Sequence, residues 1–239
     1  YGNDNPVRRY NQSINADIIQ RKFPNSKYGM LTYFIYNLIR LIIKRPFSYQ
    51  NIIKIVKENS KSWRNFFYRC SRVLPPFIDN LDILHLQWAK TLVYYPEFIE
   101  KITCPIIMSL RGTHINYSPI LDEQLAKGYK KYFPFVAGFH AVSNAIAIEA
   151  KKYNADSSKI TIIPPSVKEE FINYIPKTHI AGELLNIISI GRCHWIKGYT
   201  LALDSMYLLK QKDVKFHYTI IADGHDSENI NYQIHDLGL

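Results

Sequence analysis

Apolar residues follow a helical spacing in the first third of the chain and a mixed spacing after it. Steps of three and four residues predict helices over 28–44, 49–58 and 62–73. Pro46 follows the first helix, and Pro75 and Pro76 follow the third, as expected where helices end. In the first helix we expect one buried face, formed by Leu31, Phe34, Ile35, Leu38 and Ile42.

From about residue 80 onward, short apolar runs alternate with helical stretches. The pattern predicts a helix after Pro96 and others over 121–132, 144–153, from Tyr199, and over 227–237. It predicts strands over 82–86, 105–110, 139–143, 159–163, 186–190 and 215–222. This alternation is typical of βαβ units with parallel sheets. Because residues 172–183 have no clear period, we interpret them as a linker between two α/β domains.

The positive charge of the chain is concentrated at its N-terminal end. The whole chain carries +10, whereas residues 1–75 alone carry 14 Lys and Arg against three Asp and Glu, a balance of +11. Aromatic residues are interleaved with these cations, which favours an anionic membrane surface as a partner for residues 28–72. A solvated basic face on core helices explains the charge equally well. We expect no nucleic-acid partner, because no recognised nucleic-acid motif is present.

Other features of the composition narrow the class of protein. An apolar fraction of 47% excludes a disordered chain. The longest apolar stretch, residues 30–43, contains Thr32, Asn37 and Arg40 and is too short and too polar to span a bilayer. Three scattered cysteines suggest a reducing compartment. Since the chain starts at Tyr1 and stops at Leu239, near a predicted helix end, we expect a fragment.

The stretch 186–200 is the most informative part of the sequence. An apolar run ends at Gly191, a loop carries Arg192 and Lys197, and a helix follows Gly198. The free N–H groups and the dipole of a helix N-terminus favour an anion, and the two cations suit a diphosphate. The order of residues fits neither a Walker loop nor a Gly-x-Gly-x-x-Gly motif. A basic loop with two solvated cations is the alternative.

This stretch resembles glycosyltransferase family 4, which has the GT-B fold and carries a Gly-Arg-x-x-x-x-Lys-Gly loop at the start of its C-terminal domain. The match falls on Gly191, Arg192, Lys197 and Gly198. The resemblance implies that these residues bind the diphosphate of a nucleotide-sugar donor. The resemblance covers roughly residues 80–239, because several strand ends in this range follow one another in the order found in the family.

The end of the strand at 105–110 corresponds to a second part of the family's donor site. Family members usually have His-Gly there, often followed two residues later by Asp. In this chain Arg111 takes the place of the His, Gly112 matches, and His114 takes the place of the Asp. Arg111 could stabilise phosphate charge and His114 could titrate near neutral pH, so we treat both as candidate catalytic residues. For His114, a loop histidine bonded to the backbone is the alternative.

Other strand ends match the family in part. Asp223 and Gly224 match a Gly-Asp-Gly-Pro turn, and we expect no metal there and no cofactor. His85 ends the strand at 82–86, where we expect a satisfied core histidine. A Gly-rich loop after the first strand and a Glu-x7-Glu motif, both found in the family, are missing from these 239 residues.

Together these features predict an α/β protein of GT-B-like architecture, with two Rossmann-like parallel-sheet domains, a helical N-terminal segment and an incomplete C-terminal domain. We expect an N-terminal, acceptor-side domain over 1–172 with its helical segment at 28–73, a linker over 173–184, and the first part of a nucleotide-sugar-binding domain over 185–239.

The resemblance implies the function of a retaining, hexosyltransferase-like enzyme. It would move a sugar from a nucleotide-diphosphate donor to a saccharide or lipid-linked acceptor in bacterial surface polysaccharide synthesis. We expect the fragment alone to be inactive, and the protein to be cytoplasmic, with a peripheral position at the inner membrane face. The alternative is a non-catalytic α/β module that binds a phosphorylated ligand.

Overall fold

A computed structural model describes residues 23–24, 26–167, 169–173 and 182–239. The chain divides by its internal contacts into one unit up to Ser166 and a second from Val167 onward, and we describe each by itself. The predicted linker at 173–184 lies largely outside the described residues, so the predicted domain bounds stay a prediction. Residues 1–22, which belong to the basic N-terminal end, also lie outside the described residues.

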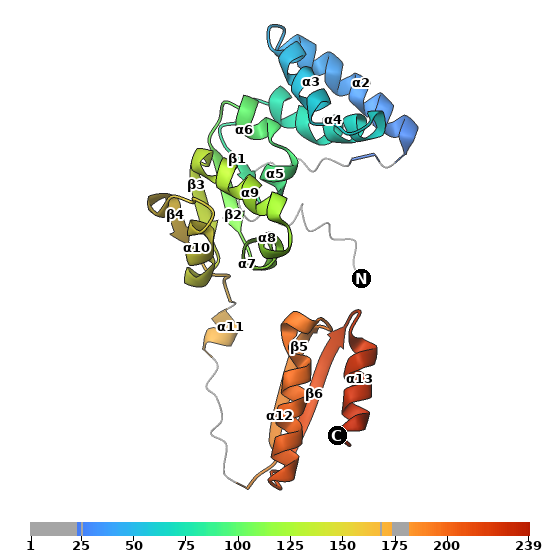
Figure 1. Ribbon diagram of the computed structural model, residues 1–239, viewed down its shortest axis with the longest axis vertical. Coiled ribbons are helices and arrows are strands. Elements are labelled where there is room, and N and C mark those ends of the chain that lie inside the picture. Colours follow the sequence, from blue (N-terminus) through green and yellow to red (C-terminus); the bar gives the residue numbers. More distant parts are fainter. Residues whose placement is uncertain (1–22, 25, 168, 174–181) are drawn as a thin grey trace. The chain divides into compact units, whose positions relative to one another are not determined.

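The N-terminal unit begins with a group of helices, as the sequence predicts (Figure 1). Ser26 caps the first helix by accepting the N–H of Gly29, and Ser62 caps the third by accepting the N–H of Asn65. The helices are α2 (Lys27–Lys44), α3 (Tyr49–Glu58) and α4 (Trp63–Ile78). α2 packs mainly against α4.

The buried face of α2 differs from the predicted one. Met30, Asn37 and Leu41 are buried, whereas Leu31, Ile35 and Ile42 of the predicted face are exposed. Apolar residues occupy most of the circumference of α2, so the spacing alone could not select the side that meets α4. The exposed side of α2 is therefore unusually apolar.

α4 extends through Pro75 and Pro76, although the sequence predicts an end at Val73. Both prolines fall in the last turn, where their missing N–H groups leave the carbonyls of Ser71 and Arg72 without their usual helical donors. Val73, Leu74 and Phe77 are buried in this segment. Packing of this apolar end, at roughly 1.5–3 kcal/mol for a fully buried large side chain, compensates for the lost hydrogen bonds.

The rest of this unit is a parallel sheet with helices. The sheet order is β1-β2-β3-β4, all parallel. The strands are β1 (Leu84–Leu86), β2 (Ile106–Leu110), β3 (Gly138–Ala141) and β4 (Ile160–Ile162). The helices are α5 (Lys90–Tyr94), α6 (Glu97–Lys101), α7 (Thr113–Asn116), α8 (Ser118–Leu121), α9 (Glu123–Tyr132), η1 (Phe133–Phe135), α10 (Asn144–Lys151) and η2 (Ser157–Lys159). Ser143 caps α10 as predicted, accepting the N–H of Ile146.

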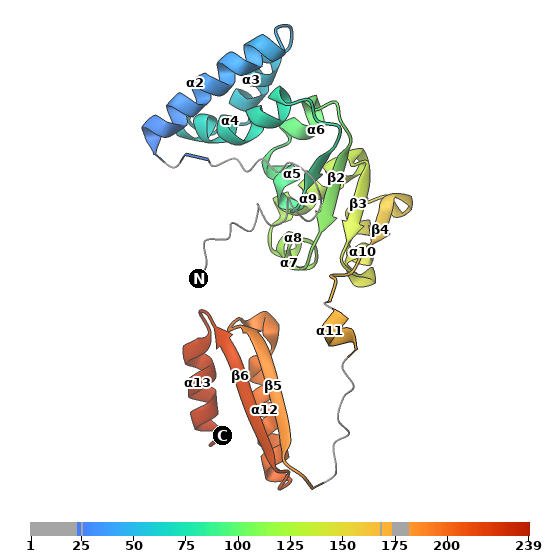
Figure 2. The same cartoon turned by 180° about the vertical axis from the view of Figure 1, so that it is seen from behind.

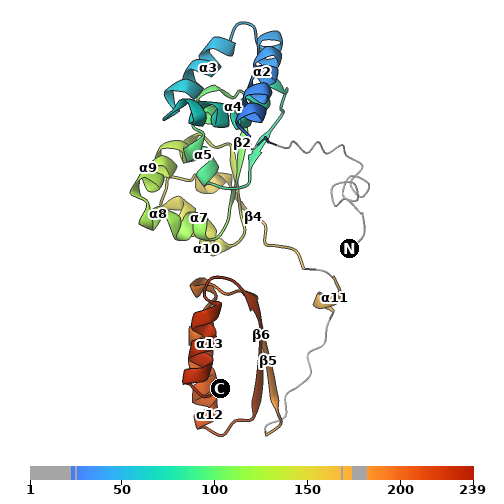
Figure 3. The ribbon, with the colours of Figure 1, turned by 90° about the vertical axis from the view of Figure 1, so that its right-hand side faces the viewer.

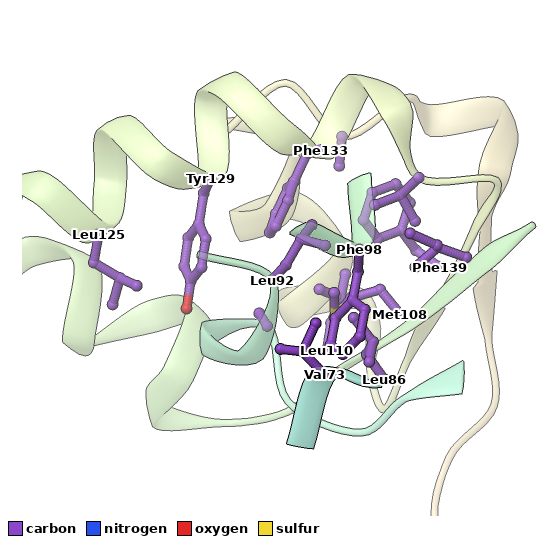
Figure 4. Packing of buried hydrophobic residues seen from close by; sticks show 14 of the residues in the cluster. Val73, Leu86, Leu92, Phe98, Met108, Leu110, Leu125, Tyr129, Phe133 and Phe139 are labelled. Atoms are coloured by element: carbon purple, nitrogen blue, oxygen red, sulfur yellow. The ribbon is translucent and has the colours of Figure 1, made fainter. Parts of the chain in front are cut away.

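The core of this unit lies between the sheet and the helices on one side of it. Met108 and Leu110 of β2 project into this core, where Leu92, Tyr129 and Phe133 meet them (Figure 4). Figure 3 shows α5, α7, α8, α9 and α10 on that side of the strands. Because strand side chains alternate, the residues between these core positions face the other side of the sheet.

The opposite face of the sheet carries His85, Ser109 and His140. His85 is exposed and its neighbour Ile83 is 58% exposed, so the prediction of a core histidine is wrong. The reason is that no described helix covers this face at β1 (Figure 3). His85 instead bonds to side chains on the same face.

The second unit contains α11 (Glu169–Ile172), β5 (Leu185–Arg192), η3 (Trp195–Lys197), α12 (Tyr199–Gln211), β6 (Phe216–Asp223) and α13 (Ser227–Asp236). β5 and β6 are parallel, and α12 and α13 lie on one side of them (Figure 3). Tyr199, Leu203 and Ile230 are buried against the strands. Figure 2 shows the strands from the side without helices.

Two details of β5 differ from the prediction. The strand continues through Gly191 and Arg192, which the sequence places in the loop, because backbone pairing with β6 persists to Asp223. The strand is also not buried on both faces: Ile188 and Ile190 are exposed, since the described helices cover only one face.

The fold class is confirmed as α/β with parallel sheets in both units and a helical N-terminal segment. Within the described residues, no helix is long and apolar enough to cross a membrane.

Candidate functional site

Arg192 is the last residue of β5, directly opposite Asp223 at the end of β6. Its side chain is exposed and follows the alternation of Ile188 and Ile190, so it leaves the strand on the face without helices. Among the described residues, no ion pair is formed by Arg192. The guanidinium is therefore available to an anion at the carboxyl end of the strand, where open parallel sheets bind their ligands.

The loops after β5 and β6 are joined by backbone contacts. Cys193 donates its N–H to Asp223 O at 2.8 Å, and Asp226 donates its N–H to Cys193 O at 3.3 Å. Gly224 lies so close that a β-carbon there would stand 2.6 Å from Cys193 O, and its φ of 146° also disfavours other residues. These contacts fix the start of the candidate site against β6.

A short turn carries the chain from the strand to α12. His194 caps η3 by accepting the N–H of Ile196 on Nδ1 at 3.3 Å, and Lys197 and Gly198 close the turn through backbone bonds. Gly198 has a left-handed backbone, with φ of 70°, which glycine adopts without steric cost. The turn therefore delivers Lys197 immediately before the first turn of the helix.

Lys197 lies against Gly191 on the helix-covered face of β5. A β-carbon at Gly191 would stand 3.1 Å from the Tyr199 hydroxyl and 3.6 Å from Lys197 Cε. Arg192 and Lys197 thus border the end of β5 from its two faces, and both are exposed. The structure gathers all four predicted residues, Gly191, Arg192, Lys197 and Gly198, around one strand end.

The N-terminus of α12 adds to the positive character of this strand end. Gly198 is the N-cap, and no side chain caps the helix. The first N–H groups of such a helix have no intrahelical partner, and its dipole favours a negative charge there. Two cations and a helix N-terminus at one place form an arrangement that can bind a phosphate or diphosphate.

In the N-terminal unit, Arg111 follows β2 and turns toward the end of β1. Its Nη2 donates to Gln87 Oε1 at 2.9 Å, and its guanidinium carbon lies 6.0 Å from the centre of the Trp88 ring. Gly112 has a φ of 40° with open space around it, so the backbone conformation alone requires glycine there. Arg111 is exposed and is held by the side chain of Gln87.

His114 lies in the first turn of α7 after Thr113, and its ring packs at a tilt of 35° against the same tryptophan. The ring centres of Trp88 and His114 are 4.5 Å apart. Burial lowers the pKa of His114, and the nearby Lys90 charge lowers it further. Its Nδ1 is buried and has no hydrogen-bond partner among the described residues. The neutral imidazole therefore has a free ring nitrogen, and the alternative of a ring bonded to the backbone finds no support at Nδ1.

The structure brings Arg111 and His114 together through Trp88. The sequence did not assign roles to Gln87, Trp88, Ser109 or His140, which contact or support these residues. Ser109 and His140 could have been found, because each is a polar residue that alternates with core residues in a predicted strand. Within the described residues, no group of three or more His, Cys, Asp or Glu side chains is arranged to hold a metal ion.

No family model matches the chain, and no curated protein matches it. Among solved structures, a crystal structure of TarM aligns with a TM-score of 0.47 at 17% identity, over 64% of this chain and 30% of TarM. A mutant of S. aureus TarM in complex with fondaparinux, α-GlcNAc-glycerol and UDP aligns with the same score and identity, over 66% of this chain and 31% of that one. The chain thus spans about a third of the length of these structures.

Proposed function

We propose that this chain belongs to a GT-B glycosyltransferase that moves a sugar from a nucleotide-diphosphate donor to an acceptor. The observation that carries the proposal is the strand end at which Arg192, Lys197 and the uncapped N-terminus of α12 occur together. Stabilising charge on a departing diphosphate is the physical task of such an enzyme, and these groups suit it. The sequence resemblance to family 4 supplies the reaction class.

The finer parts of the proposal rest on the resemblance. They are retention at the anomeric carbon, a saccharide or lipid-linked acceptor, and a place in bacterial surface polysaccharide synthesis in the cytoplasm. Arg111 would stabilise phosphate charge, and His114, which shares the contact with Trp88, would be a second catalytic residue beside it. No metal or cofactor is part of this proposal.

The exposed side of α2 favours an anionic membrane surface as a further partner. Large apolar residues form one stripe along α2, continued by Phe47 after it, which is 98% exposed. The stripe consists of Tyr28, Leu31, Ile35, Ile39, Ile42 and Ile43. Lys27 and Lys44 are exposed at the two ends of the helix. Apolar side chains framed by lysines suit the boundary between headgroups and acyl chains.

The test is donor chemistry by the full-length protein. Each of several nucleotide-diphosphate sugars is incubated with the enzyme, and hydrolysis or transfer is followed by release of the nucleoside diphosphate. Turnover that falls in Arg192→Ala supports the transferase. Tight binding of a nucleoside diphosphate without turnover of any donor, with or without an acceptor, favours the alternative of a non-catalytic module that binds a phosphorylated ligand.

Chain 1–239 gives a second measurement. We expect it to bind nucleoside diphosphates only weakly, with a Kd of about 1 mM or roughly −4 kcal/mol, and to show no transfer. Robust turnover by purified 1–239 would contradict the proposed assignment of the missing motifs to the donor site.

A further inference from the structure

A line of hydrogen bonds crosses the face of the N-terminal sheet that lies opposite the core. At one end, His140 Nε2 lies 3.0 Å from Ile163 O, and His140 Nδ1 lies 3.1 Å from Ser109 Oγ. Ser109 Oγ also lies 2.9 Å from His85 Nε2. The line therefore joins three adjacent strands to the residue that follows the fourth.

The line continues to the candidate catalytic arginine. Gln87 Nε2 lies 3.3 Å from His85 Nδ1 and farther, 3.5 Å, from His85 Nε2, so its bond is assigned to Nδ1. Gln87 Oε1 accepts from Arg111 Nη2 at 2.9 Å. Ser109, at the middle of the line, is fully buried, whereas His85, Gln87 and Arg111 are exposed. Because the Ser109 hydroxyl is buried and contacts two ring nitrogens, it must make its hydrogen bonds with those nitrogens.

The two ends of the line fix the direction of its bonds. Ile163 O can only accept, so His140 Nε2 carries a proton, and in a neutral ring His140 Nδ1 must accept the hydroxyl proton of Ser109. With that proton used, Ser109 Oγ accepts from His85 Nε2.

The other end gives the same result. Arg111 can only donate, so the oxygen of Gln87 faces Arg111 and its amide nitrogen faces His85. His85 Nδ1 must then accept, which again leaves the proton on Nε2. Both ends thus demand the same tautomer of His85, and every bond of the line runs in one direction, from Arg111 to Ile163 O.

We infer that His85, Ser109 and His140 are positioning residues for Arg111, and that they hold it only while both imidazoles are neutral with the proton on Nε2. The groups of the described chain that hydrogen-bond to the two rings are Ser109, Gln87 and Ile163 O, and none of them is a carboxylate.

A proton added to His140 would be transmitted to Arg111. With both nitrogens of His140 protonated, Ser109 accepts from His140, and its buried hydroxyl proton then finds a partner in the line only by donation to His85 Nε2. The proton of His85 then moves to Nδ1, where it requires the oxygen of Gln87. The amide of Gln87 turns over, its nitrogen faces Arg111, and two donors meet, so Arg111 is released. Protonation of His85 itself turns Gln87 in the same way.

The test is the tautomeric state of the two rings in chain 1–239. Long-range proton–nitrogen NMR spectra separate the protonated ring nitrogen from the bare one, and His85→Gln and His140→Gln assign the signals. At pH 7.5 we expect the proton on Nε2 of both rings. As the pH is lowered, protonation of His140 should change the tautomer of His85. A proton on Nδ1 of either ring at pH 7.5 would overturn the inference.

Two variants and a control make this test specific. Ser109→Ala should abolish the response of one ring to the other, and an unchanged response would overturn the inference. Gln87→Glu changes only an exposed side chain, so folding is not at risk, and its carboxylate should place a proton on His85 Nδ1. An Nδ1 that stays bare would overturn the inference. Thr161→Ala removes a hydroxyl from the residue beside His140 in the sheet and should change neither ring.

Only the benefit to catalysis rests on the proposed transferase function. In the full-length enzyme, Ser109→Ala should lower kcat at pH 7.5, because Arg111 is then no longer held by the line. If the protein lacks transferase activity, the NMR result stands. If the NMR result fails, the proposed function stands without this support for Arg111.

Discussion

The side chain of Lys197 lies against Gly191, the residue near the end of β5 that has no side chain. A β-carbon there would be 3.6 Å from Lys197 Cε, an ordinary contact, and 3.1 Å from the Tyr199 hydroxyl, a tight one. Glycine at this position thus leaves the space that Lys197 occupies on its way to the strand end. The glycine that precedes the lysine by six residues in the sequence motif therefore has a steric reason: it leaves room for the lysine side chain.

Enlarging residue 191 should therefore displace Lys197. We expect Gly191→Val to weaken binding of a nucleoside diphosphate by about tenfold, roughly 1.4 kcal/mol, while Gly191→Ala changes it much less. Isothermal titration below the unfolding temperature of each variant measures this. Equal affinities for Gly191→Val and wild type would show that Lys197 does not reach the ligand along this path.

The cations themselves should contribute to transition-state stabilisation in the full-length enzyme. We expect Arg192→Ala and Lys197→Ala each to lower kcat/KM by about tenfold to a thousandfold, roughly 1.4–4 kcal/mol. Arg192→Lys should recover only part, because the planar fork is lost. Lys212→Ala, at the far end of α12, is the matched control and should keep wild-type kinetics. Wild-type kinetics in both alanine variants would make the loop a solvated turn.

The proposed membrane binding depends on the apolar stripe of α2 and on lysine. Lys44 is a suitable basic target because it is exposed. Arg40 and Arg45 are unsuitable, because Arg40 pairs with Asp79 at 3.4 Å and Arg45 donates to Phe77 O at 3.3 Å. We expect Lys44→Gln to weaken sedimentation with anionic vesicles by a factor of a few, since each lysine near the surface adds about 1 kcal/mol.

The apolar part of that surface has a matched control. The triple variant Ile39→Ser, Ile43→Ser and Phe47→Ser should abolish sedimentation with anionic vesicles. Ile120→Ser with Leu121→Ser removes comparably exposed apolar side chains from α8 and should leave it unchanged. Binding of wild type should weaken as salt rises. Equal binding to neutral vesicles, or none to either kind, would remove the membrane role.

The ion pair of Arg69 and Glu97 should be the most sensitive polar contact of the N-terminal unit. Arg69 Nη2 lies 2.6 Å from Glu97 Oε1, and Glu97 is 1% exposed. We expect Glu97→Ala to lower the free energy of unfolding by about 3–5 kcal/mol, because it leaves a buried charge unpaired. Glu149→Ala breaks an exposed pair with Lys152 and should cost about 0–1 kcal/mol. Urea unfolding measures both, and similar losses would contradict this account.

His114 should make the stability of the fold depend on pH. Burial lowers its pKa in the folded state below the ordinary value of about 6.5, so the unfolded chain binds the proton more readily. The contribution of His114 is therefore complete above about pH 6.5 and is lost as the pH falls toward the folded-state pKa. We expect His114→Phe, which keeps a ring against Trp88, to lose less stability between pH 7.5 and 5.5 than wild type. An identical pH dependence would contradict the lowered pKa.

The sequence by itself determined the order and type of most elements. Apolar periodicity placed α3 at its observed bounds, and alternating runs located every strand to within a few residues. Ser143 predicted the start of α10, because a capping side chain acts within its own turn. The four residues around the end of β5 are close in the chain, so local spacing was sufficient to group them.

Only the tertiary structure decided which faces are covered. The apolar residues of α2 surround most of the helix, and contact with α4 selected the side of Met30 and Leu41. β5 extends through Arg192 because β6 continues to pair with it. His85 lies outside the core, since covering a sheet depends on where helices from distant parts of the chain pack. The line from His140 to Arg111 joins residues from separate strands, and register between strands is a property that spacing along one strand does not contain.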